Sequence, residues 1–169
     1  MPRTTPWAGG GASPAHGGAD PRSRAEPDGG VEPLRTLHRL DELVELVRDR
    51  RGLCVRYSEG PEADAGRRSI DTESGLELPG LSVNPLDVEE WWIRPLDDWL
   101  ARQLCDYHHL SLRNPDRFAW VLRGRFVGRG PDCEPLLAEP VPVARLGEQL
   151  LQEAEARYRR NFDAGHGPE

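Results

Sequence analysis

The chain of 169 residues contains no lysine, and all 22 of its basic residues are arginine. The absence of lysine excludes a Schiff-base lysine and the lysine of a nucleotide-binding phosphate loop. Arginine carries a planar fork of donors that binds carboxylates and phosphates in a bidentate manner. The general arginine bias, together with abundant alanine, glycine and proline, is typical of a GC-rich genome. Anion binding therefore has to be argued from individual arginines.

Cysteine is scarce as well: Cys54, Cys105 and Cys133 are odd in number, far apart and without a C-x-x-C pair. This spacing fits neither a disulfide framework nor a structural zinc site, and it is typical of proteins in a reducing cytosol. Cys105 with His108 and His109 is the only cluster of potential metal ligands in the sequence. A zinc site needs three or four ligands at suitable spacing, so we expect no metal.

Long hydrophobic runs are also missing. No stretch approaches the roughly 18–20 apolar residues of a membrane span, and the N-terminus lacks the apolar region of a secretory signal. The net charge of −7 excludes the basic footprint that is typical of nucleic-acid-binding proteins. We therefore expect a cytoplasmic protein that binds neither a membrane nor nucleic acid.

Composition divides the chain into three parts. Residues 1–33 consist mainly of glycine, proline, alanine and scattered charge, and they predict a disordered tail because they have little to bury. Residues 34–162 have an ordinary core content and a length that fits one domain. Residues 163–169 are polar and predict a disordered C-terminal tail.

Hydrophobic periodicity predicts three principal helices, at residues 37–51, 95–107 and 145–162. Proline and acidic residues predict a further helical turn at 85–92. The remaining apolar stretches predict extended segments, at residues 53–58, 76–84, 118–130, 133–138 and 141–143. This order of helices and strands indicates a single α+β domain, with a mixed or antiparallel sheet flanked by about three helices.

Tryptophan is concentrated in the middle of the chain. Large aromatic side chains bury roughly 150–250 Å² each, so a group of them is expected to dominate a small core. We expect Trp91 or Trp92 to meet Trp99 and Trp120 in that core.

The segment 53–58 provides the first candidate site. On alternation, Arg56 and Ser58 share one strand face, and this polar face indicates a cleft. A long loop follows, and its Arg67-Arg68 pair either holds an anion or is simply solvated. Candidate ligand-binding residues are Arg56, Tyr57 and Ser58, and the expected partner is a small anionic ligand or another protein.

In chain order, Arg56, Ser82 and Glu134 resemble the arginine–serine–glutamate arrangement of ADP-ribosyltransferases. The resemblance implies NAD as cofactor, with Arg56 holding its phosphate or ribose and Ser82 bracing the nicotinamide pocket. Catalytic Glu134 would then stabilise the oxocarbenium-like transition state as nicotinamide leaves, and Tyr57 would stack on the ring. The chain departs from the family pattern at Ser82-Val83-Asn84, where S-T-S is usual.

The stretches VRYSEGP, LPGLSVNPL, WVLRGRFVGRGPD and EPLL resemble an uncharacterised actinobacterial family, a domain of unknown function. That resemblance extends from Leu37 to Tyr158 and implies a cytosolic single-domain protein without an assigned activity. Two hypotheses therefore remain open. One is a binding or regulatory module without a cofactor, built around an arginine-bearing cleft. The other is an NAD-dependent enzyme similar to ADP-ribosyltransferases.

Overall fold

The structure, a computed structural model, describes residues 33–162 and shows a single α+β domain. The tails predicted at 1–33 and 163–169 lie outside these residues, except for Pro33. Six strands form one curled sheet: β1 (Thr36–Leu37), β2 (Cys54–Ser58), β3 (Leu81–Ser82), β4 (Asn84–Pro85), β5 (Phe118–Arg129) and β6 (Pro135–Leu146). The strand order is β1-β6-β5-β2-β4, and β3 pairs with β6. Only β1 and β6 are parallel, so the predicted mixed sheet is confirmed.

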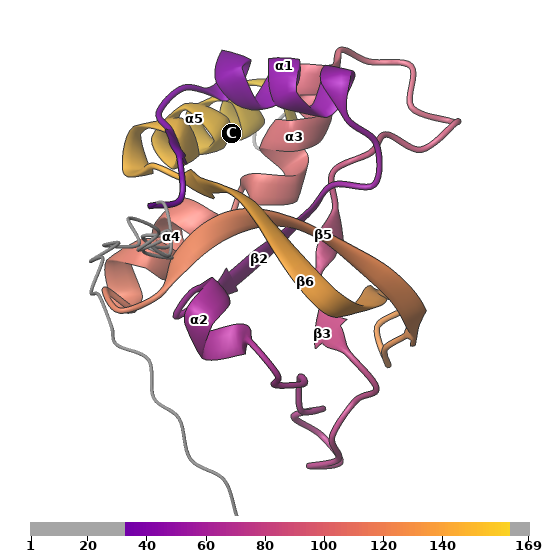
Figure 1. The fold of residues 1–169 in the computed structure, drawn as a ribbon. Helices are drawn as coiled ribbons and strands as arrows, with labels where there is room; N and C mark the ends of the chain where they lie inside the picture. The colour runs from indigo at the N-terminus through magenta and orange to yellow at the C-terminus, as the bar shows by residue number, and fades with distance from the viewer. Residues whose placement is uncertain (1–32, 163–169) are drawn as a thin grey trace, which may run out of the picture. The chain divides into compact units, whose positions relative to one another are not determined.

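The hairpin of β5 and β6 is the longest part of the sheet (Figure 1). Its register shifts at several points, for example between Val121 and Leu122, and such bulges increase the twist of a strand pair. The extended segments at 133–138 and 141–143 were predicted to be separate, but both belong to the single strand β6. Pro140 and Pro142 fall between the parts of β6 that pair with β3 and β1, where an outer neighbour is lacking and proline is tolerated.

In residues 33–162, five helices accompany the sheet: α1 (Leu40–Asp49), α2 (Pro61–Asp64), α3 (Leu96–Leu104), α4 (Tyr107–Arg113) and α5 (Glu148–Phe162). Helices α1, α3 and α5 lie together on one side of the sheet, whereas α2 lies on the opposite side (Figure 1). These three larger helices confirm the predicted helical content. None of the helices in residues 33–162 has the length and apolar character needed to cross a membrane.

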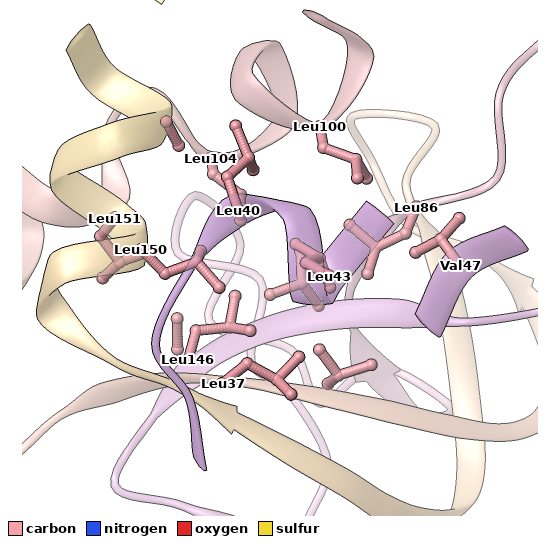
Figure 2. Packing of buried hydrophobic residues seen from close by; sticks show 14 of the residues in the cluster. Leu37, Leu40, Leu43, Val47, Leu86, Leu100, Leu104, Leu146, Leu150 and Leu151 are labelled. Carbon is pink, nitrogen blue, oxygen red and sulfur yellow. The ribbon is translucent and has the colours of Figure 1, made fainter. Parts of the chain in front are cut away.

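The main core lies between the three larger helices and the sheet (Figure 2). Each helix contributes leucines, with Leu43 from α1, Leu100 from α3 and Leu150 from α5 completely buried. They pack toward Leu37 and Leu146 at the β1–β6 pairing. Burying one such side chain contributes about 1.5–3 kcal/mol, so this side of the sheet carries most of the apolar stabilisation.

A smaller apolar cluster covers the opposite face of the sheet, and its central residue is the fully buried Trp120. The indole Nε1 of Trp120 donates a hydrogen bond to Ser58 Oγ at 2.9 Å. The prediction that Trp120 meets the other tryptophans is wrong. Successive residues of a strand face opposite sides, so Ala119 and Val121 face the helices and Trp120 faces away from them.

Trp91, Trp92 and Trp99 do form a group, with ring centroids 5.1–6.1 Å apart in edge-on geometry. Trp99 is buried and donates to Leu86 O at 3.1 Å, whereas Trp91 is 62% exposed. The prediction of a helical turn at 85–92 is wrong. Pro85 pairs with Cys54 in the sheet, so the chain is extended where the helix was expected to begin.

A buried carboxylate joins α3 to α5. Asp98 accepts hydrogen bonds from Arg157 Nε and Asn161 Nδ2, both at 2.7 Å, and from Arg94 Nε at 3.2 Å. Burial raises the pKa of Asp98, but the bonds from Asn161 and Arg157 outweigh burial, and the pKa lies below the ordinary value of 3.8. The ionised form of Asp98 is therefore the one that stabilises the fold.

We expect Asp98→Asn to flatten the acid dependence of stability. A depressed folded-state pKa gives stability that is present above the unfolded value and is lost as pH falls through the folded value. The wild-type free energy of unfolding should therefore fall as the pH drops below about 4, whereas the variant should start lower and change less. Urea unfolding at a series of pH values above and below about 4 measures the free energy of unfolding of the wild type and of the variant. Asp106→Asn, which removes an unbonded carboxylate beside α4, should keep the wild-type slope; an unchanged slope in Asp98→Asn would contradict the assignment.

Candidate functional site

Arg56 lies in the middle of β2 and points to the face opposite the three larger helices. Its Nε and Nη2 donate to Asp64 Oδ2 and Oδ1 at 2.8 and 3.1 Å, which is a bidentate ion pair. The side chains of Arg56 and Asp64 are 17% and 8% exposed. Since Asp64 is the last residue of α2, the pair fixes this short helix on the sheet.

The remaining nitrogen of the Arg56 guanidinium holds the neighbouring segments. Nη1 donates to Ser82 O at 2.8 Å and to Ser69 Oγ at 3.2 Å. Ser69 Oγ in turn accepts from Ser82 N at 2.9 Å. Arg56 therefore connects β2, α2, the loop at Ser69 and β3, and its fork is directed at protein groups.

Ser58 completes this network. Its hydroxyl donates to Asp64 Oδ2 and accepts from Trp120 Nε1 and from Gly60 N, the latter at 3.2 Å. Gly60 has φ of 112°, and a Cβ there would lie 2.6 Å from the Phe118 ring. Glycine is therefore required between β2 and α2, where the chain turns closely over β5.

These residues border a cavity of about 550 Å³, which we name the Arg56 cavity. Small-molecule sites usually have roughly 300–1,000 Å³, so the volume suits a ligand of ordinary size. Ser82 and Glu134 also line this cavity, and Ser82 Oγ donates to Glu134 Oε1 at 3.1 Å. Glu134 lies immediately before β6, and its Oε2 accepts from Asp132 N at 3.0 Å. The structure therefore brings Arg56, Ser82 and Glu134 to one cavity.

The rim of the Arg56 cavity carries further arginines. Arg68 pairs with the exposed Glu77 at 3.4 Å. Arg67, from the loop after α2, and Arg117, directly before β5, also line the cavity. Within residues 33–162, neither of these two guanidinium groups makes an ion pair or a side-chain hydrogen bond. Both are exposed and available to a ligand.

Acidic groups share the same rim. Glu59 and Asp132 line the Arg56 cavity as exposed residues, and neither is paired with an arginine of the part of the chain that the structure describes. The rim is therefore not uniformly positive. It presents donors at Arg67 and Arg117 and acceptors at Glu59 and Asp132.

Tyr57 occupies a different position from its neighbours in β2. It borders the Arg56 cavity, but its hydroxyl donates to Leu110 O at 2.7 Å and its ring lies 5.9 Å from that of Tyr107. Burial raises the pKa of the Tyr57 hydroxyl. Its polar end is thus bound to α4 on the helix side of the sheet.

The cysteine and histidines singled out in the sequence lie where α3 gives way to α4. The helix predicted at 95–107 ends at Leu104, so Cys105 lies between two helices and His109 belongs to α4. His108 Nδ1 lies 2.5 Å from Glu155 Oε2. Nowhere in residues 33–162 do three or more His, Cys, Asp or Glu side chains group in a way that could hold a metal ion.

Sequence reasoning missed Asp64 and Arg117 as site residues. Asp64 lies in an acidic, turn-rich stretch and shows no pattern that marks it from Glu59 or Glu62. Arg117 reaches the cavity because Phe118 pairs with Ser58 across β5 and β2, which is a long-range register. Of the two unpaired arginines on the rim, only Arg67 was marked by a sequence pattern, the adjacent pair Arg67-Arg68.

Residues 30–167 match the model of a family described as Family of unknown function (DUF6098). The chain belongs to this family. The match includes every residue that the structure describes, so the DUF6098 region carries the whole Arg56 cavity. Comparison with curated proteins and with solved structures gives no match. The predicted membership in a family of unknown function is therefore confirmed.

The ion pair at the base of the cavity should be essential to the DUF6098 fold. Breaking a buried pair by removing one partner costs about 3–5 kcal/mol, because the other charge remains buried and unpaired. We therefore expect Asp64→Asn to lower the free energy of unfolding by about 3 kcal/mol, as measured by urea unfolding. Glu77→Gln breaks the exposed pair with Arg68 and should cost about 1 kcal/mol or less. Equal, small losses in the two variants would show that Asp64 does not hold the site together.

Proposed function

We propose that this DUF6098 protein is a small-molecule binding module that takes an anionic, hydroxyl-bearing ligand in the Arg56 cavity. The observation that carries the proposal is the availability of Arg67 and Arg117 on the rim of a ligand-sized cavity. Hydrogen bonds between a guanidinium and an anionic oxygen are charge-assisted and are among the strongest in proteins. In this proposal, the anionic group of the ligand binds to Arg67 and Arg117.

The two arginines come from separate parts of the fold. Arg67 follows α2, and Arg117 precedes β5, so an anion between them would connect the loop to the sheet. Arg56 has a different role in this proposal, because its fork is already engaged by Asp64. It forms the rigid floor of the cavity and positions the loop that carries Arg67.

The acidic groups favour a ligand that has hydroxyls in addition to its anionic group. Ionised carboxylates accept hydrogen bonds only, so the exposed Glu59 and Asp132 favour a ligand that brings donors to them. Inorganic phosphate carries its few hydroxyl donors on the charged group itself, so it offers no separate donors to reach these carboxylates while its anionic oxygens bind the arginines. Sugar phosphates and nucleotides satisfy both ends, and they form the expected ligand class.

We expect ribose 5-phosphate to bind the wild-type protein and to bind more tightly than inorganic phosphate in isothermal titration calorimetry. The double variant Arg67→Gln, Arg117→Gln should weaken the affinity at least about tenfold, which corresponds to about 1.4 kcal/mol. Arg113→Gln serves as the control, since it removes an exposed arginine that does not line the cavity. The proposal fails if the double variant binds as well as this control.

A second candidate is an NAD-dependent enzyme that resembles ADP-ribosyltransferases. It is favoured because Arg56, Ser82 and Glu134 line one cavity and Ser82 Oγ donates a hydrogen bond to Glu134 Oε1. The Glu134 carboxylate would stabilise the positive charge that develops as the bond between ribose C1′ and nicotinamide breaks and water attacks C1′, giving ADP-ribose, nicotinamide and a proton. The engagement of Arg56 by Asp64 is the reason why the binding module is preferred, since that fork would have to hold the NAD phosphate.

The enzyme candidate predicts that the protein releases nicotinamide from NAD, detected by chromatography. Glu134→Gln keeps the size of the side chain but removes its charge, so we expect the rate to fall by about a hundredfold or more. Glu59→Gln removes another carboxylate of the same cavity and should keep most of the activity. Absence of nicotinamide release, or a rate that Glu134→Gln leaves unchanged, rejects this candidate and leaves the binding module untouched.

A further inference from the structure

We propose that a second, smaller cavity in the domain binds a carboxylate group through Asn84 and Tyr107. This cavity has about 220 Å³ and is named here the Tyr107 cavity. It adjoins the Arg56 cavity, because Arg56, Tyr57 and Ser82 border both. It opens where β2 and the segment after β3 diverge, beyond the pairing of Val55 with Asn84.

The wall of this cavity contains a buried hydroxyl with a proton to donate. Tyr107 is only 8% exposed, and its Oη accepts a hydrogen bond from Asn84 Nδ2 at 2.7 Å. Within residues 33–162, this bond from Asn84 is the hydrogen bond that the Tyr107 hydroxyl makes, and the hydroxyl donates none. Burial raises the pKa of Tyr107 to about 12, so the hydroxyl keeps its proton at physiological pH. A buried donor of this kind favours an acceptor from a ligand.

The direction of the Asn84 amide does not alter this conclusion. With Nδ2 toward Tyr107, the phenolic proton and the second amide hydrogen are both left for the cavity. With the amide turned, Oδ1 accepts the phenolic proton and both amide hydrogens are left instead. In either arrangement the Asn84–Tyr107 pair presents hydrogen-bond donors to whatever occupies the cavity.

The wall contains nothing that would repel an anionic acceptor. Among residues 33–162, no aspartate or glutamate lines the Tyr107 cavity, whereas several line the Arg56 cavity. Arg56 is the only charged residue of this described part of the chain in the wall. Asp64 neutralises much of that charge from the other side, so directed donors rather than net charge determine what binds.

The size of the cavity favours a planar carboxylate. A cavity of about 150 Å³ holds a benzene ring, so about 220 Å³ accommodates a small carboxylic acid with room for an aromatic or aliphatic substituent. The two oxygens of a carboxylate match the two donors that the Asn84–Tyr107 pair leaves free, which come one from each residue when Nδ2 faces Tyr107. A small monocarboxylate, acetate to benzoate in size, is therefore the expected occupant.

The test is a titration of the ¹⁵N-labelled full chain with acetate and with benzoate, followed by NMR. Binding should shift the side-chain amide resonances of Asn84, which are assigned by their loss in Asn84→Ala. Tyr107→Phe removes the donor but keeps the ring, and it should weaken the affinity about tenfold. Tyr57→Phe is the matched control, because its hydroxyl is bound to Leu110 O, and it should bind like the wild type.

Three results would overturn the proposal: no shift of the Asn84 amide on adding either carboxylate, an equal shift on adding chloride at the same concentration, or equal affinities for Tyr107→Phe and Tyr57→Phe. If Tyr107→Phe does not fold, Asn84→Ala has to show the weakened benzoate binding in its place, read from backbone amides of Val55 and Tyr57. This site is independent of the proposed function. The variant Arg67→Gln, Arg117→Gln should lose ribose 5-phosphate binding and still bind benzoate.

Discussion

The arrangement of the polar face depends on the ion pair between Arg56 and Asp64. Helix α2 is a single turn of four residues, and isolated helices of this length are not stable in water. Its only buried residue is Asp64, so apolar packing does not hold it in place. The bonds that Asp64 makes with Arg56 and Ser58 do so, and the same guanidinium also fixes Ser82. Both cavities have Arg56 in their walls and therefore inherit their shape from this pair.

Strand alternation separates the part of the domain that provides stability from the part that provides chemistry. In β2, Val55 faces the leucine core of the helices, whereas Arg56 faces the other way. In β5, Val121 and Trp120 make the same division. The helix side holds most of the buried apolar side chains, so the opposite side can accommodate a buried ion pair and the polar Arg56 cavity.

Local sequence patterns predicted most helices and strands, whereas the contacts between them depend on long-range strand pairing. The periodicity of α1 and the alternation around Arg56 were both visible in the sequence, and the meeting of Arg56, Ser82 and Glu134 was expected only under the resemblance to ADP-ribosyltransferases. Periodicity failed at Pro85, where a helix start was expected, because pairing with Cys54 prevails over local preference. The partner of Arg56 could not be predicted, since the contact with Asp64 depends on how a turn-rich loop folds back over the sheet.

The departure at Ser82-Val83-Asn84 from the S-T-S pattern acquires a structural meaning. Asn84 replaces a small hydroxyl side chain with an amide, and this amide is long enough to bond Tyr107 at the start of α4. A serine at the same position would have a shorter side chain and a single hydroxyl in place of an amide, so the paired donors would be lost. Ser82 of the same segment thus borders both cavities, whereas Asn84 borders the Tyr107 cavity alone of the two, so this departure from the pattern bears on the Tyr107 cavity.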